Sequence, residues 1–291
     1  MSDINLIDII SLIDEPFSDS SFIPTYLLTK EIKKYCTVAI GGDGADELFG
    51  GYKSYQNLLK HKLLLDTIPK QFKKFLLNII NSSLPVGFKG RNYLNNLLTD
   101  IDHYRGNLIF DMKSRDQLIK LNNDELYIED YLYSRSLKSS DKLRNLMYCD
   151  FTNYLPDDIL FKTDRASMLN SLALRSPFLD KRVIQFASGM TKSNLTSRSS
   201  GKLFLKKFLK HKFPSNFNFD RKQGFSISLK NLLSQKFLRE IINDMSENDP
   251  ILNKKFIVKL ADSLKNGYSN HERLYSIVVF HVWRRNYQIG L

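Results

Sequence analysis

An acidic, glycine-rich stretch from Gly41 to Tyr52 is the part of the sequence best suited to chemistry. It follows a short apolar run. Its glycines allow a ligand to approach the backbone closely, and the free N–H groups of such a turn can bind phosphate. Three carboxylates, Asp43, Asp46 and Glu47, stand close together and would repel a bare phosphate. A bridging Mg²⁺, which prefers oxygen ligands, removes that repulsion. The stretch therefore favours a metal-bridged nucleotide.

The spacing within this stretch excludes three familiar motifs. A P-loop needs Gly-Lys-Ser/Thr, a dinucleotide fingerprint needs a third glycine where Glu47 stands, and a calcium hand needs a longer loop with ligands at alternate positions. Asp43 and Asp46 are three residues apart, so one helical turn would place both on the same side. The simpler structural alternative is an acidic helix N-terminus stabilised by the helix dipole. On the pattern alone, both interpretations stay open.

Helices dominate the segments that must position this turn. Helix-spaced apolar residues predict helices over 3–13 and 20–35, and almost everywhere after Tyr52. Breaks are predicted near Pro69, 83–90, Pro156, Pro177, 193–201 and Pro214, with 193–201 as a mobile loop. The run 36–40 is apolar and β-favouring, and predicts a buried strand that ends at the glycine turn. One strand cannot form a sheet, because its backbone groups need neighbours.

The composition is that of a globular protein, with 42% hydrophobic and 25% charged residues among 291. The 43 basic and 31 acidic residues give a net charge of +12, which suggests an anionic partner. The lysines at 70–74 and 202–207 have the spacing of solvated faces of amphipathic helices. That interpretation is favoured over a nucleic-acid groove, since no nucleic-acid-binding motif accompanies them. A basic helical nucleic-acid binder remains the alternative.

The sequence favours a cytoplasmic protein. Cys36 and Cys149 match no disulfide framework or metal motif and are expected to be small buried hydrophobes in a reducing compartment. The apolar stretch 274–283 is too short for a membrane span of roughly 20 residues. The start of the chain shows no secretion signal. Neither membrane insertion nor secretion is expected.

Several blocks along the chain occur in the order found in one enzyme family. They lie at 14–21, 36–52, 154–158, 164–168, 175–180 and 221–225. Together they resemble the synthetase domain of glutamine-dependent asparagine synthetases, over nearly the whole chain. The resemblance implies an α/β fold of the adenine-nucleotide α-hydrolase-like type. Within this chain we expect a predominantly helical structure with one strand at about 36–40, the earlier sheet strands being missing.

The resemblance also implies a reaction and a set of site residues. In that family, ATP activates the side-chain carboxylate of aspartate as an acyl-adenylate, pyrophosphate leaves, and ammonia attacks to give asparagine. Asp46 would hold Mg²⁺ on the phosphates, and Asp43 occupies an acidic position near the reacting groups. Lys222 matches a lysine that stabilises developing negative charge. The nucleotide would lie against Gly41, Gly42 and Gly44.

The block from 164 to 180 is expected to be at least partly structural. Its charged residues could form ion pairs that hold helices around the site, because buried charges must be paired. These residues are Asp164, Arg165, Arg175 and Asp180. The family usually has a glutamate two residues before the arginine, whereas this chain has Ala173. This departure favours a change in activity or in substrate.

Two larger departures predict an incomplete site. The family's glutaminase domain begins with a nucleophilic cysteine, whereas this chain begins Met1-Ser2 and enters the synthetase part directly. The pyrophosphate loop, Ser-Gly-Gly-x-Asp-Ser, is absent too. We therefore expect residues 1–291 to form one N-terminally incomplete synthetase domain, whose strand at 36–40 has unpaired edges.

This expected incompleteness leaves the partners and several functions open. A separate chain could carry the glutaminase domain and the pyrophosphate loop, and a homodimer is a further expectation. The open alternatives are a non-catalytic remnant or binding module of the same fold and an amide ligase like β-lactam synthetase.

Overall fold

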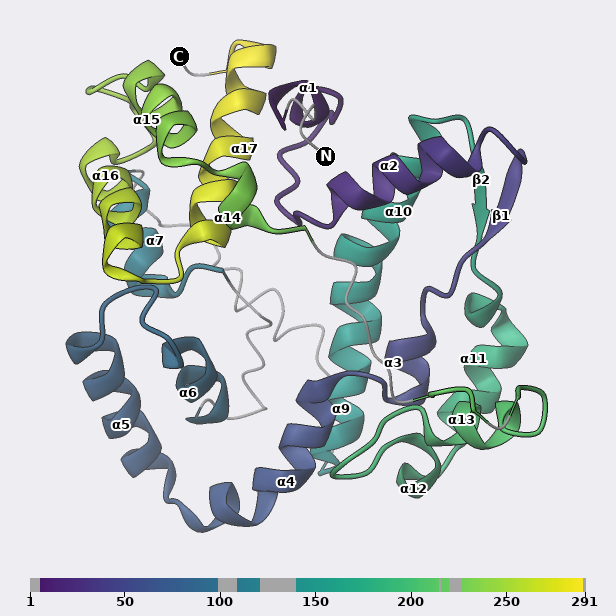
Figure 1. Ribbon diagram of the computed structural model, residues 1–291. Coiled ribbons are helices and arrows are strands. Elements are labelled where there is room, and N and C mark those ends of the chain that lie inside the picture. Colours follow the sequence, from purple (N-terminus) through teal and green to yellow (C-terminus); the bar gives the residue numbers. More distant parts are fainter. Residues whose placement is uncertain (1–5, 99–108, 121–139, 215, 220–226, 290–291) are drawn as a thin grey trace.

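The computed structural model describes residues 6–98, 109–120, 140–214, 216–219 and 227–289 (Figure 1). The fold is mostly helical, as expected, with a small parallel sheet. Up to residue 120 the described elements are α1 (Leu6–Ser11), α2 (Phe22–Ile32), β1 (Val38–Ile40), α3 (Ala45–Phe49), α4 (Lys53–Thr67), α5 (Lys70–Ser83), α6 (Arg91–Leu98) and α7 (Met112–Leu118). The next are α9 (Lys142–Cys149), η2 (Asp150–Leu160), α10 (Phe161–Met168), β2 (Ala173–Arg175), η3 (Pro177–Leu179), α11 (Lys181–Ser188), α12 (Lys192–Leu195) and α13 (Leu203–Leu209). The last are α14 (Leu229–Leu232), α15 (Gln235–Asp244), α16 (Lys254–Ser263), η4 (Leu264–Asn266) and α17 (His271–Tyr287).

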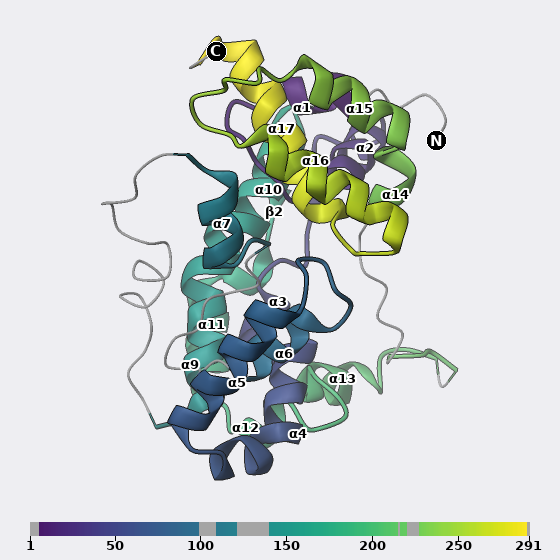
Figure 2. The ribbon, with the colours of Figure 1, turned by 90° about the vertical axis from the view of Figure 1, so that its left-hand side faces the viewer.

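A long helical rod formed by α9, η2 and α10 runs through the molecule (Figures 1 and 2). Its middle part, η2, is a π-helix that contains Pro156. The sequence predicts a break there, because proline lacks an N–H and its ring clashes with the preceding turn. That prediction is wrong: the chain continues through the proline as a wider π-helix. The rod therefore keeps residues 142–168 in one continuous element.

The sheet consists of β1 and β2, which are parallel and pair in the register Val38↔Ala173 to Ile40↔Arg175. Each strand follows one of two helices that pack against each other, α2 and α10. The Thr29 hydroxyl on α2 donates a hydrogen bond to the Ala166 carbonyl of α10 (2.9 Å). Figure 1 shows both strands at the outer side of this helix pair.

The predicted strand at 36–40 is confirmed as β1, but two expectations about it need correction. Val38 is 54% exposed and Ile40 is 77% exposed, so the strand is not buried. One of its edges pairs with β2, which the sequence analysis did not predict. Exposure follows because helices cover only one side of this small sheet, whereas parallel sheets are normally covered on both faces. Cys36, just before the strand, is also exposed, contrary to expectation, while Cys149 is buried as expected.

The larger apolar core lies in the C-terminal helical cluster, which we define as α14–α17 with α1 and α7. Leu274, Val278 and Ile257 are almost fully buried within it. The helix predicted at the end of the chain is confirmed as α17, which packs against α1, α14 and α16. Asn253 caps α16 by accepting a hydrogen bond from the Phe256 N–H (3.3 Å). The cluster combines apolar packing with a capped helix end.

A second apolar core surrounds α3, at the other end of the rod. Phe49 of α3, Tyr55 of α4 and Leu146 of α9 are buried there. The Phe49 ring stacks on Phe204 of α13 at 6.2 Å and meets Phe178 of η3 edge-on at 5.8 Å. This core fixes α3, and with it the acidic turn, against four other elements. No helix in the described part of the chain has the length and apolar character of a membrane span.

Candidate functional site

The acidic turn begins where β1 ends, and the end of β2 reaches it as well. The Gly41 N–H donates to the Arg175 carbonyl (2.7 Å), which extends the pairing of the two strands. The next residue after β2, Ser176, then donates its hydroxyl to Asp43 Oδ2 (3.3 Å). In open α/β sheets, ligands bind outside the carboxyl ends of parallel strands. Asp43 lies at such a position.

A glycine separates the two aspartates that the sequence analysis placed on one helical turn. Gly44 is the N-cap of α3 and has φ of 88°, a left-handed conformation that favours glycine. A Cβ on Gly44 would also overlap Leu179. Asp43 therefore lies before the helix and only Asp46 lies within it, so the expectation of a shared helical turn is wrong. The two carboxylates have different partners.

Burial raises the pKa of two carboxyls of this turn. Burial raises the pKa of Asp43, although the hydrogen bond from Ser176 and the nearby Lys162 ammonium oppose the shift. Burial likewise raises the pKa of Glu47, whose carboxylate accepts a short hydrogen bond from the Tyr52 hydroxyl (2.5 Å). Glu47 is only 3% exposed, so it acts as a structural partner of Tyr52. Asp43 is less buried than Glu47, and is the one of these two carboxyls that could transfer a proton to or from a ligand.

Asp46 is paired with a cation of the chain. Its Oδ2 lies 3.0 Å from the Lys202 ammonium, just before α13, and both side chains are partly exposed. Within the described residues, no three His, Cys, Asp or Glu side chains form a metal-binding group. Mg²⁺ on a nucleotide commonly uses only one or two carboxylates plus phosphates and water. Asp46 offers one partly exposed carboxylate, which could serve as one of these ligands.

The rod adds a polar stripe that the sequence analysis did not assign. Asp150, Tyr154, Asp158 and Lys162 recur every fourth residue, and this spacing was the signal that could have revealed them. Tyr154 meets Tyr52 edge-on at 5.9 Å, which connects the stripe to the acidic turn. Asp150 accepts a hydrogen bond from the buried hydroxyl of Tyr55 (2.7 Å).

Lys162 joins the stripe to the segment before α2. Its ammonium lies 2.6 Å from Asp19 and 3.5 Å from Asp158. Burial raises the pKa of Asp19, but Lys162 and hydrogen bonds from Ser21 outweigh burial, and the pKa lies below its usual value. Burial and the Asp19 carboxylate raise the pKa of Asp158 to about 7. Lys162 thus pairs with two carboxylates, but the effect of burial on the pKa is outweighed only for Asp19.

The four charged residues proposed as structural ion pairs do not pair with one another. Arg165 lies 3.5 Å from Asp14, so it links α10 to the segment before α2. Asp180 pairs with Arg182 at 3.0 Å and caps α11, and Arg175 donates to the Leu174 carbonyl (3.2 Å). Asp164 lies in the first turn of α10. Lys222 lies outside the described residues, as does most of the block around it.

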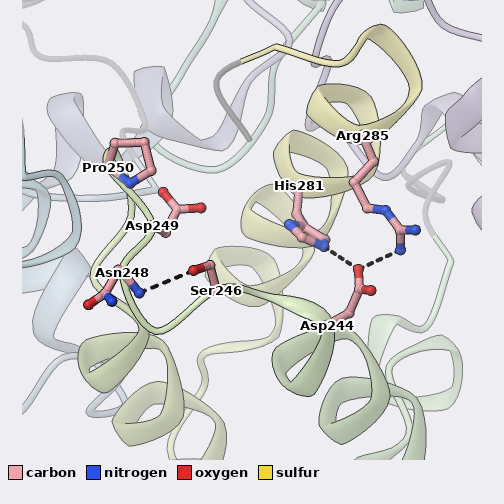
Figure 3. Close-up of a pocket in the computed structure, with 7 residues that line it drawn as sticks. All are labelled: Asp244, Ser246, Asn248, Asp249, Pro250, His281 and Arg285. Atoms are coloured by element: carbon pink, nitrogen blue, oxygen red, sulfur yellow. Dashed lines mark hydrogen bonds and ion pairs between the residues drawn. The ribbon is translucent and has the colours of Figure 1, made fainter.

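A pocket of about 480 Å³ lies far along the chain from the acidic turn, beside α15 and α17 (Figure 3). Among the residues that line it, Asp244 lies 2.8 Å from His281 Nε2 and 2.5 Å from an Arg285 nitrogen. Its carboxylate thereby ties the end of α15 to α17. A second pocket, of about 450 Å³, lies between α5, α7 and α16. Neither pocket includes a residue of the acidic turn, so the convergence of strand ends identifies the site better than cavity size does.

The comparisons with known proteins assign this mostly helical fold and its acidic turn to a family. The family model "Asparagine synthase" matches residues 1–285. The chain belongs to the asparagine synthase family.

Its relatives include "Asparagine synthetase [glutamine-hydrolyzing] 1" of Bacillus subtilis, 33% identical over 278 residues, which cover 93% of this chain and 44% of the relative. "Putative asparagine synthetase [glutamine-hydrolyzing]" of Mycobacterium bovis is 28% identical over 285 residues, covering 95% of this chain and 43% of the relative. "Putative asparagine synthetase [glutamine-hydrolyzing] 2" of Methanocaldococcus jannaschii is 37% identical over 173 residues, covering 57% of this chain and 32% of the relative. The chain thus spans less than half the length of these relatives.

Proposed function

We propose that this chain takes part in ATP-dependent amide formation, in which aspartate becomes asparagine through a β-aspartyl-adenylate. The observation that carries the proposal is the meeting of both strand ends at Asp43, within a chain of the asparagine synthase family. In the first step, a carboxylate oxygen of aspartate bonds to the α-phosphorus of ATP and pyrophosphate leaves. In the second, the ammonia nitrogen bonds to the acyl carbon, AMP leaves and one proton is released.

Each residue of the acidic turn would have its own role in this reaction. Gly42, where a Cβ would meet nothing within 4 Å, leaves room for the nucleotide, and the backbone at Gly41 and Gly44 would lie beside it. Asp46 would hold Mg²⁺, which neutralises charge on the phosphates when it is bound. Asp43, whose pKa burial raises, would accept the proton from the attacking nitrogen. Lys222 would stabilise the negative charge that develops on the phosphate and the acyl oxygen.

The polar stripe of the rod would recognise the amino group of the substrate. Burial is the largest cause of the raised pKa of Tyr154. Four carboxylates lie close enough to raise it further: Asp158, Asp19, Glu47 and Asp150. Among the described residues, Lys162 pairs with two of them, Asp19 and Asp158. A surplus of buried carboxylate attracts a cation, and the α-ammonium group of an amino acid supplies one. This favours an amino acid as the acyl donor.

Residues beyond these 291 would complete the site. Val38 and Ile40 expose apolar side chains on the sheet, and a two-stranded parallel sheet open on one face is unusual. This surface favours further strands, which would bring the pyrophosphate loop and a source of ammonia, on the same polypeptide or a separate chain. A second copy of the chain is the competing occupant, and sedimentation would reveal it as a dimer.

The test is aspartate- and ammonia-dependent release of pyrophosphate from ATP, with and without an added N-terminal segment of a relative. We expect turnover only with the added segment, and a loss of at least about a hundredfold in Asp46→Asn, since charge-stabilising groups commonly contribute that much. Asp262→Asn is the matched control, because Asp262 of α16 is exposed and pairs with Lys265 of η4 at the surface. Full turnover by the isolated chain would contradict the need for further residues.

Ala173 favours a second candidate, a non-catalytic binding module of the same fold. It stands in β2, where the family usually has a glutamate. This candidate predicts no pyrophosphate release under any complementation and no effect of Asp46→Asn on nucleotide binding. Release with a bulkier amino-acid substrate but not with aspartate would instead favour a β-lactam-synthetase-like ligase. Tight, salt-sensitive binding to duplex DNA would favour the nucleic-acid binder.

A further inference from the structure

Lys202, which forms an ion pair with Asp46, has an unusual backbone conformation. Lys202 has φ of 54° and ψ of 37°, a left-handed conformation that non-glycine residues rarely adopt. Its N–H donates to the Phe49 carbonyl at the end of α3 (3.2 Å), and its ammonium lies 3.0 Å from Asp46 Oδ2. Both the backbone and the side chain of this lysine are therefore fixed by α3, the helix that carries Asp46.

Two glycines permit this close approach. A Cβ on Gly51 would overlap both the Asp46 carboxylate and the Lys202 side chain, and a Cβ on Gly201 would overlap the Gly50 carbonyl. The acidic turn and the segment 196–201 thus lie in direct backbone contact. Lys202 connects them through its side chain.

The segment 196–201 is a closed turn. Thr196 and Gly201 form an antiparallel bridge, and the Ser197 N–H donates to the Ser200 carbonyl (2.8 Å). The Lys206 ammonium donates to the Ser200 hydroxyl (2.6 Å). The sequence predicts a mobile loop here, whereas the structure gives it a regular hydrogen-bonding pattern that ends at Lys202.

We propose that Lys202 is a positioning residue whose ammonium holds Asp46 in place until a divalent cation displaces it, so that cation binding at α3 releases the turn at 196–201. The proposal rests on the proposed function, in which Asp46 is the cation ligand. Mg²⁺ binds carboxylate oxygens at roughly 2.0–2.1 Å. An ammonium at hydrogen-bond distance from the same carboxylate would repel it, because like charges at such a separation interact strongly. The lysine must withdraw as the cation enters.

Removing the competing charge should tighten cation binding. We expect Lys202→Met to bind Mn²⁺ about two- to five-fold more tightly than the unaltered chain, the factor that a partly exposed ion pair contributes. A merely structural lysine predicts the opposite, because loss of its contacts would disorder Asp46 and weaken binding. Lys206→Met is the matched control: it also removes an ammonium bound to this segment, but it leaves the Asp46 pair intact. Lys202→Arg keeps the charge and should bind Mn²⁺ like the unaltered chain.

The experiment measures free Mn²⁺ by electron paramagnetic resonance in titrations of the 291-residue chain and its variants, after thermal melts show that each is folded. Hydrogen–deuterium exchange of the amides at 196–201 is the second measurement. Support requires tighter binding by Lys202→Met, and Mn²⁺-induced exchange in the unaltered chain that rises to the level of Lys202→Met without metal. Unchanged or weaker binding by folded Lys202→Met would overturn the proposal, as would the absence of Mn²⁺ binding in every variant.

Asp46→Asn separates this failure from a failure of the proposed function. If Asp46→Asn binds Mn²⁺ as the unaltered chain does, Asp46 is not the cation ligand and the proposed function loses its metal site. If Asp46→Asn abolishes binding while Lys202→Met leaves it unchanged, the metal site stands and only the displacement of Lys202 is wrong.

Discussion

The buried Arg284–Asp249 pair of the C-terminal helical cluster differs from the carboxyls of the acidic turn in how burial is compensated. In the cluster, Arg284 and Asp249 are almost fully buried and lie 2.9 Å apart. Asp249 also accepts hydrogen bonds from the Ile251 and Leu252 N–H groups (2.8 and 2.7 Å). Burial raises the pKa of this carboxyl, but these bonds and Arg284 hold it below its usual value.

In the site, burial raises the pKa values of Asp43, Glu47 and Asp158, and their partners do not offset it. The Arg284–Asp249 pair therefore has its charges satisfied within the cluster. The site keeps carboxylates that a ligand or a proton can stabilise further, a pattern that is common where binding or catalysis occurs.

The largest expected effect is the loss of the buried ion pair in the cluster. Arg284→Met leaves the Asp249 carboxylate buried without its cation, and we expect the free energy of unfolding to fall by about 3–5 kcal/mol. Urea unfolding followed by circular dichroism measures it. Arg285→Met is the control: Arg285 is on the same helix but is more than half exposed, so its loss should have a small effect. Equal effects of both variants would contradict the comparison.

Truncation of an apolar side chain should likewise cost more stability in the cluster than on the exposed face of the sheet. Ile257→Ala removes a side chain that is 1% exposed, and we expect a loss of about 2–5 kcal/mol. Ile40→Ala removes one that is 77% exposed on the sheet, and we expect a change within about 0.5 kcal/mol in the isolated chain. The same urea titrations measure both. A large loss for Ile40→Ala would mean that the sheet face is already covered, for example by a second copy of the chain.

The stability of the site should depend on pH through Asp158. Its pKa rises from 3.8 to about 7 on folding, so the folded protein binds the proton more tightly than the unfolded chain. Stability associated with this group is fully present below pH 3.8 and is lost as the pH rises towards 7. Asp158→Asn should therefore stabilise the chain by about 1–2 kcal/mol at pH 8 and by much less at pH 4. Urea midpoints at the two pH values test this, and an equal effect at both would contradict it.

The smallest expected effect concerns helix ends. Asn253 caps α16 in the cluster, and we expect Asn253→Ala to cost about 1 kcal/mol. The corresponding position of α3 is Gly44, which has no side chain to cap the helix. The midpoint of thermal unfolding measures the change. No change in Asn253→Ala would mean that this cap adds nothing to the stability of the cluster.

Local signals in the sequence were sufficient to predict much of the fold. Periodic apolar residues predict α2 and α17, and the β-branched run predicts β1, because these patterns reflect geometry within a single element. The glycines and carboxylates of 41–52 single out the acidic turn for the same reason. The order of the blocks predicts the family, which the match over residues 1–285 confirms.

Only the tertiary structure decided which distant groups meet. β2 is three residues long, too short for a periodic signal, and it exists because Ala173–Arg175 pairs with β1. The pairing of Lys202 with Asp46, and of Lys162 with Asp19 and Asp158, joins residues far apart in the chain. The exposure of Val38 and Ile40 depends on how α10 packs against β2 and leaves one face of the sheet uncovered. Sequence pattern fixes what lies on one element, whereas burial and charge pairing depend on the packing of several.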